Sequence, residues 1–154
     1  MMIEDEELRD IFKLASEEHL QKLEDGLLYI EKNPEDRTKL EELLREAHSL
    51  KGDAGMLGVK DVSTLAHQME HILGGIKRGE TTLTPIISDR LYHGLDAIRQ
   101  LVREAVTGEP PNINAFHALA YMMGANSSTP STSEKTEEAV QKETTAIPSP
   151  EPEK

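Results

Sequence analysis

The sequence predicts an all-α protein, an antiparallel four-helix bundle with an additional short helix at its C-terminal end. Apolar residues recur at spacings of three and four over most of the first 125 residues, which is the period of one helix face. No segment alternates apolar and polar residues, and Val, Ile and aromatic residues never cluster as they do in strands. Because short turns between long helices favour antiparallel neighbours, these helices are expected to form a bundle.

The first predicted helix runs from about Glu4 to Glu31. Acidic residues 5–7 suit the positive end of its dipole, and Asn33-Pro34 ends it because proline disrupts a helix. The spacing places on one face the apolar residues Leu8, Ile11, Phe12, Ala15, Leu20, Leu23, Leu27 and Ile30.

The second and third predicted helices follow each other across a very short turn. The second runs from about Asp36 to Leu57 and ends at Gly58, and the third runs from about Val59 to Arg78 and ends at Gly79. The apolar face of the second consists of Leu40, Leu43, Leu44, Ala47, Leu50, Ala54 and Leu57. The apolar face of the third consists of Val62, Leu65, Ala66, Met69, Ile72, Leu73 and Ile76.

Thr84-Pro85 predicts the start of the fourth helix, because a capping hydroxyl is followed by proline at the first helical position. Gly108 and Pro110-Pro111 end this helix. Its apolar face consists of Ile86, Ile87, Leu91, Leu95, Ile98, Leu101, Val102 and Ala105. A short fifth helix is expected to bury Ile113, Phe116, Leu119, Ala120 and Met123.

A change of composition divides the chain into a domain at residues 1–125 and a segment at residues 126–154. The second segment is rich in Ser, Thr, Pro and Glu and has only four apolar residues, so it cannot bury enough surface to fold. We expect it to be disordered, and its composition fits a linker and a tail without a role equally well.

The overall charge of −12 and the absence of cysteine exclude several classes of protein. Nucleic-acid and anionic-membrane surfaces need clustered Lys and Arg, which an acidic chain does not favour. Without cysteine there is no disulfide, no iron–sulfur cluster and no thiolate zinc site. No apolar run approaches the length of a membrane span, and residues 1–7 do not resemble a signal peptide. We therefore expect a cytoplasmic protein.

Polar residues beside the apolar face of the second helix form a stripe that packing does not explain. His48, Lys51, Gly52 and Gly55 follow one another at helical spacing. A glycine inside a helix costs roughly 0.5–1 kcal/mol relative to alanine. Two glycines beside a histidine let a partner surface approach the imidazole closely, so Gly52 and Gly55 are candidate docking residues.

A similar stripe on the third helix consists of His67, Glu70 and Gly74. If the second and third helices form an antiparallel hairpin, His48 can meet Glu70. A carboxylate that accepts a hydrogen bond from one ring nitrogen fixes the tautomer and leaves the other nitrogen with a free lone pair. Lys51 would then place positive charge where a phosphoryl group on His48 carries negative oxygens.

These residues resemble the histidine-phosphotransfer (HPt) domain of CheA-type chemotaxis kinases. The likeness rests on residues 47–55, Ala-His-Ser-Leu-Lys-Gly-Asp-Ala-Gly, on Gly58, and on residues 65–70, Leu-Ala-His-Gln-Met-Glu. It covers residues 1 to about 123, including the order of the helices. It implies that His48 is phosphorylated by a kinase's ATP-binding domain and passes the group to an aspartate of a response regulator. Lys51, His67 and Glu70 would support it through charge and hydrogen bonds.

The resemblance implies a two-component signalling role in which this chain is a carrier. The chain has no glycine-rich nucleotide loop, so ATP and Mg²⁺ are expected on partner domains and self-phosphorylation is not expected. The expected partners are a histidine kinase catalytic domain and a receiver domain, with no nucleic acid and no membrane insertion. We expect the domain to be monomeric and residues 126–154 to lead toward the next domain.

Three other interpretations stay open: a free-standing phosphorelay carrier, a non-catalytic helical adaptor and a zinc peptidase. The last comes from residues 67–71, which match a His-x-x-Glu-His signature, although the chain nominates no third ligand and no metal site is expected. The pair Gly74-Gly75 departs from the family pattern. It either weakens the third helix locally or clears room for a partner.

Overall fold

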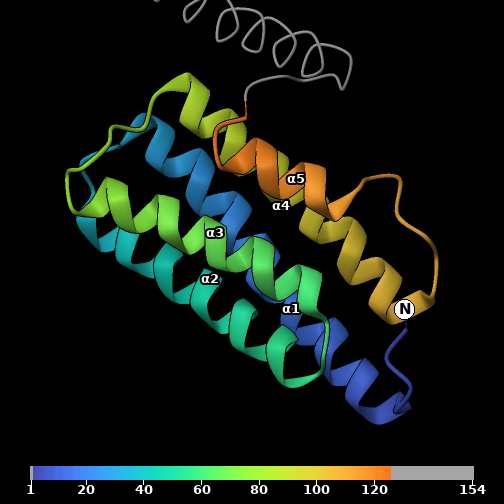
Figure 1. The fold of residues 1–154 in the computed structure, drawn as a ribbon. Coiled ribbons are helices and arrows are strands. Elements are labelled where there is room, and N and C mark those ends of the chain that lie inside the picture. Colours follow the sequence, from blue (N-terminus) through green and yellow to red (C-terminus); the bar gives the residue numbers. More distant parts are fainter. Residues whose placement is uncertain (1, 126–154) are drawn as a thin grey trace, which may run out of the picture. The chain divides into compact units, whose positions relative to one another are not determined.

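The computed structural model describes residues 2–125, and within them it contains five helices and no strands. The helices are α1 (Glu6–Lys32), α2 (Arg37–Met56), α3 (Lys60–Lys77), α4 (Pro85–Thr107) and α5 (Ala115–Met122) (Figure 1). All five predicted helices are confirmed, with bounds close to those expected. The predicted linker or tail at residues 126–154 lies outside the described residues.

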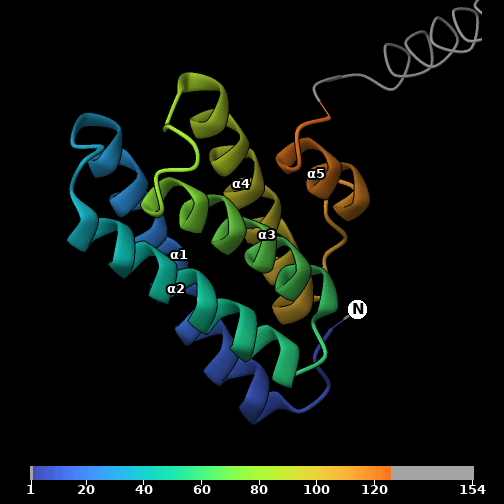
Figure 2. The ribbon, with the colours of Figure 1, turned by 60° about the vertical axis from the view of Figure 1, so that its left-hand side comes forward.

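The first four helices form the predicted bundle. Helix α1 packs against α2 and α4, and α3 packs against α2 and α4, while α5 lies against α3 and α4 (Figures 1 and 2). Helix α3 therefore stands between α2 on one flank and α4 with α5 on the other. None of the helices in the described part of the chain is long and apolar enough to cross a membrane.

Four of the five helices begin at a side-chain cap. The side chains of Asp5, Asp36 and Asn114 each accept a backbone N–H three residues on, at 3.0 Å. The hydroxyl of Thr84 accepts the N–H of Ile87 at 3.2 Å, with Pro85 at the first helical position as the sequence predicts. Each cap satisfies one of the N–H groups that the first helical turn leaves without a partner.

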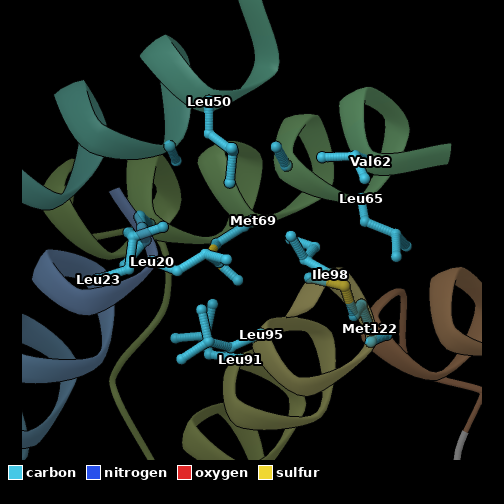
Figure 3. Packing of buried hydrophobic residues seen from close by; sticks show 14 of the residues in the cluster. Leu20, Leu23, Leu50, Val62, Leu65, Met69, Leu91, Leu95, Ile98 and Met122 are labelled. Carbon is cyan, nitrogen blue, oxygen red and sulfur yellow. The ribbon is translucent and has the colours of Figure 1, made fainter. Parts of the chain in front are cut away.

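Side chains from all five helices meet in one apolar core (Figure 3). Fully buried members include Leu23 of α1, Leu50 of α2, Met69 of α3, Ile98 of α4 and Met122 of α5. Most of the predicted apolar positions are buried, but five are exposed instead: Leu8, Ile11, Ile86, Phe116 and Met123. They lie in the first two turns of α1, in the first turn of α4 and at the two ends of α5.

Close approach and polar contacts fix how the helices pack. A Cβ at Gly26 would overlap the buried side chain of Leu43, so glycine here lets α1 and α2 approach closely. Between α1 and α4, Glu31 accepts hydrogen bonds from Ser88 and from the Tyr92 hydroxyl, the latter at 3.1 Å. Burial, and then the bond to Glu31, raise the pKa of Tyr92 to about 12.

Candidate functional site

The turn between α2 and α3 brings His48 and Glu70 together. Gly58 takes a left-handed φ of 78°, and the N–H of Val59 donates to the carbonyl of Ala54 at 2.9 Å, so the chain reverses within three residues. The two helices then run antiparallel, and residues on their shared outer seam face each other. The meeting of His48 with Glu70 that the hairpin predicts is confirmed: Nδ1 of His48 lies 2.9 Å from Oε2 of Glu70.

The second oxygen of the same carboxylate binds Lys51. Nζ of Lys51 donates to Oε1 of Glu70 at 2.9 Å, one helical turn along α2 from His48. Glu70 and Lys51 are both about three-quarters buried, whereas 66% of the His48 side chain is exposed. One carboxylate thus holds a sheltered ammonium group on one oxygen and an accessible imidazole on the other.

The charge state of Glu70 determines the tautomer of His48. Burial opposes ionisation, but the hydrogen bonds from Lys51 and His48 together outweigh it and hold the pKa of Glu70 below its usual value. An ionised carboxylate can only accept, so Nδ1 of His48 must carry the proton that lies between them. The neutral imidazole then has its lone pair on Nε2.

Nε2 of His48 is the reactive atom that this geometry leaves free. It makes no hydrogen bond or salt bridge to any residue in the range 2–125. A neutral ring nitrogen with a lone pair, on a ring held by a carboxylate, can act as a nucleophile or a general base. Because the ring is on the surface, its reaction partner must be brought by another molecule.

The fold itself does not require the glycines beside His48. A Cβ at Gly52 would meet no atom within 4 Å, and a Cβ at Gly55 would meet only the Ser63 hydroxyl at 3.5 Å, an ordinary contact. Neither glycine has a positive φ. Their helical cost of roughly 0.5–1 kcal/mol each is therefore not offset by packing within the bundle. They keep the surface next to His48 bare.

His67 is not part of the hydrogen-bonded group. It lies one turn before Glu70 on α3, but its side chain is exposed and makes no hydrogen bond within the part of the chain that the structure describes. The supporting bond expected of His67 is thus not made in this structure. Residues 2–125 also contain no group of three or more His, Asp or Glu side chains placed to hold a metal ion.

The polar contacts of Ser63 and His19 with α2 were not predicted from the sequence. The hydroxyl of Ser63 donates to the backbone carbonyl of Lys51 at 3.2 Å and ties the start of α3 to the site turn of α2. His19 of α1 has Nδ1 2.7 Å from Glu46 and Nε2 3.3 Å from Asp53, across the seam of α1 and α2. A serine or histidine at a seam has no distinctive spacing, so the sequence carries no signal for either.

A comparison with protein families matches the chain to the Hpt domain over residues 7–104. Curated relatives include the chemotaxis protein CheA of Halobacterium salinarum, 35% identical over 62% of this chain, and that of Bacillus subtilis, 34% identical over 64%. The gliding motility regulatory protein of Myxococcus xanthus is 33% identical over 73% of this chain. The chain spans only 14–15% of the length of these three relatives.

Two solved structures share the fold. The solution structure of the histidine phosphotransfer domain of CheA matches with a TM-score of 0.70 at 32% identity, over 82% of this chain and 97% of that one. The CheA phosphotransferase domain from Thermotoga maritima matches with a TM-score of 0.62 at 36% identity, over 66% and 96%. The family match, the curated relatives and the shared fold are consistent with the exposed histidine on the surface of the bundle. The chain therefore belongs to the Hpt domain family, in the form that CheA proteins carry.

Proposed function

We propose that this domain is a phosphohistidine carrier. His48 accepts the γ-phosphoryl group of ATP bound to a separate kinase domain and donates it to an aspartate of a response regulator. One observation carries the proposal: Glu70 holds Nδ1–H of His48 at 2.9 Å, while Nε2 is unpaired within residues 2–125 on an exposed ring. That arrangement provides a nucleophile that a partner can reach.

The reaction at His48 is a nucleophilic displacement at phosphorus. The Nε2 lone pair forms the N–P bond while the bond from phosphorus to the β,γ-bridging oxygen breaks, and its electron pair leaves with ADP. The ring gains positive charge as the bond forms, and the Glu70 carboxylate, already hydrogen-bonded to Nδ1–H, stabilises that charge. Onward transfer reverses the step, with an aspartate oxygen of the receiver attacking phosphorus and His48 leaving as a neutral imidazole.

We assign to Lys51 the role of offsetting the negative charge of the phosphoryl oxygens. Its ammonium group now lies on Glu70 rather than beside Nε2, 2.9 Å from Oε1. A four-carbon stem lets the ammonium group turn toward a new anion one helical turn away without moving the backbone. The supporting role of His67 stays a prediction for the phosphorylated state, since its exposed ring is one turn from Glu70.

The partners follow from what the chemistry needs. Phosphoryl transfer from ATP requires a nucleotide site and Mg²⁺, which we assign to the kinase domain, and the reaction is placed in the cytoplasm, where ATP is available. The bare surface at Gly52 and Gly55 is the docking surface proposed for the partner that reaches Nε2. A carrier attached to its kinase and a free-standing one would use the same site.

The direct test is phosphorylation of the chain by the catalytic domain of a CheA-type kinase with radiolabelled ATP and Mg²⁺. We expect acid-labile, alkali-stable label on the wild type and on the control His117→Gln. The control changes a different exposed histidine, which lies on α5. His48→Gln should carry none. Stable binding of the partner domains without any label on the wild type would favour an adaptor and overturn the carrier function.

A further inference from the structure

A groove of about 430 Å³ lies on the flank of α3 that faces away from His48. Residues 68, 72 and 75 of α3 line it, and helical spacing places them on the opposite side of this helix from Glu70. Helix α4 contributes Ile87 and Arg90. The end of α5 contributes Met122, and Met123 follows directly after it. In Figure 2, α3 separates α2 from α4 and α5, so the groove and the phosphoacceptor site lie on different flanks.

Gly75 is a buried residue that lines this groove, and the fold does not require glycine at its position. A Cβ at Gly75 would lie 3.5 Å from Thr81 Cγ2, which is ordinary van der Waals contact, so alanine would fit. At Gly74 the added atom would be 3.0 Å from Arg78 Nη1, and there glycine makes room for the arginine. The two adjacent glycines thus have different roles, and only Gly75 is left without a packing reason.

The guanidinium groups of the two arginines that line the groove differ in their hydrogen-bond partners. Arg78 donates from Nε and Nη2 to the two oxygens of Glu80, at 2.8 and 3.1 Å. Arg90 is half-buried, and its guanidinium makes no hydrogen bond or salt bridge to any residue between 2 and 125. The chain has 29 acidic residues and a net charge of −12, yet none of those in the described range forms a salt bridge with this arginine. Five donors are therefore available to an external anion.

Apolar surface continues from the groove along α5. Met123, at the rim of the groove, is 64% exposed, and Phe116, seven residues earlier on the same face, is 74% exposed. The rise of a helix separates them by roughly 10 Å. A small molecule held in the groove would not cover this strip, whereas a peptide segment would.

We propose that the groove and the strip beside it bind an amphipathic protein segment that presents a carboxylate to Arg90 and apolar side chains to Ile87, Met123 and Phe116. The charge of Arg90 selects an acidic partner, and the exposed, flexible side chain of Met123 adapts to its apolar side chains. The absence of a side chain at Gly75 keeps this part of the groove from being filled. This surface is separate from the phosphoacceptor site, so a bound segment leaves His48 accessible.

The test is an NMR titration of the ¹⁵N-labelled chain with two synthetic peptides of about four helical turns. One peptide carries Leu on one face and Glu beside it, and the other carries Gln in place of Glu. We expect the Glu peptide to shift the amide signals of groove residues, and the Gln peptide to bind roughly tenfold more weakly, as expected for a lost charge-assisted bond.

Two variants probe the two walls of the groove, and a third variant serves as the control. Arg90→Gln removes the charge and Gly75→Leu fills the space, and each should weaken the Glu peptide at least about tenfold without changing the helical circular dichroism. Arg103→Gln, an exposed arginine of the same helix, should bind like the wild type. Arg90→Gln and Gly75→Leu with wild-type affinity would overturn the proposal.

Other occupants of the groove would also be visible in this experiment. Equal binding of both peptides, or shifts confined to another face, would show that Arg90 does not select an acidic segment. Groove signals that move with protein concentration alone would indicate a second copy of the chain instead. Because the readout is binding, a failure here is distinct from a failure of His48 to be phosphorylated.

Discussion

Oε2 of Glu70 accepts a hydrogen bond from Nδ1 of His48 at 2.9 Å, across the seam between α2 and α3. The bond joins residues from two helices, so it orients the ring only when the hairpin is formed. Lys51 completes the arrangement by occupying the other oxygen of Glu70 at 2.9 Å. The reactivity assigned to His48 therefore depends on a residue that never touches the phosphoryl group.

Removing the Glu70 carboxylate should slow phosphorylation while leaving the bundle folded. In Glu70→Ala the imidazole loses its fixed tautomer and the charge that stabilises the transition state, so we expect a rate at least about tenfold lower. The control is Glu41→Ala, which removes an exposed carboxylate of α2 that lies 3.4 Å from Lys77. Phosphorylation kinetics of Glu70→Ala that match those of the control would show that Glu70 has no orienting role.

Alanine at two glycines should change stability in opposite directions. Gly26→Ala puts a methyl group into the buried side chain of Leu43, and overpacking of this kind costs about 1–3 kcal/mol. Gly52→Ala meets no atom within 4 Å and gains helix propensity, so it should stabilise by roughly 0.5–1 kcal/mol. Urea denaturation measures both differences. A destabilised Gly52→Ala would mean that glycine is needed there for the fold.

A large side chain on the bare surface should block transfer to the receiver more than it disturbs the helix. Gly52→Leu and Gly55→Leu place bulk beside His48, and we expect phosphotransfer from the purified phosphorylated chain to slow at least about tenfold. Thr38→Leu adds similar bulk to an exposed position of α2, about 15 Å along the helix from His48, and should transfer normally. Wild-type transfer rates in both glycine variants would remove the docking role of this surface.

Acid should abolish the contribution of Glu70 to stability. Its pKa is lowered in the folded state, so the carboxylate contributes fully above its unfolded pKa, near 4.3, and the contribution is lost as pH falls through the lower folded value. We expect the wild type to exceed Glu70→Gln by less than about 1 kcal/mol at pH 7, because the His48 side of the pair is exposed. Urea denaturation at pH 7 and pH 3 should show the difference shrinking in acid. A difference that grows in acid would contradict a lowered pKa.

The helices and the core of the site were predictable because both depend on local spacing. Apolar periodicity and the caps set the five helices, and a short turn at Gly58 is enough to place His48 opposite Glu70. The position of the Lys51 ammonium group was not predictable, because a long side chain chooses among anions that only the folded surface brings near. The same holds for His19, whose carboxylate partners lie 27 and 34 residues away, and for the missing partner of Arg90.

The exposed ends of the predicted apolar faces show another limit of spacing. Phe116 and Met123 have the period of a buried face, but α5 has only eight residues and packs on α3 and α4 along one side. Periodicity tells which residues share a face. Whether a neighbour covers the whole of that face depends on where the other helices begin and end.

The most direct test of the central claim is the position of the phosphoryl group on the ring of His48. The chain, labelled with ¹⁵N and phosphorylated by a CheA-type kinase domain, can be examined by ¹⁵N and ³¹P NMR under alkaline conditions that preserve phosphohistidine. Because Glu70 occupies Nδ1, we predict that phosphorus is bonded to Nε2 of His48 and that Nδ1 keeps its proton. Phosphorus bonded to Nδ1, or to a histidine other than His48, would contradict the account.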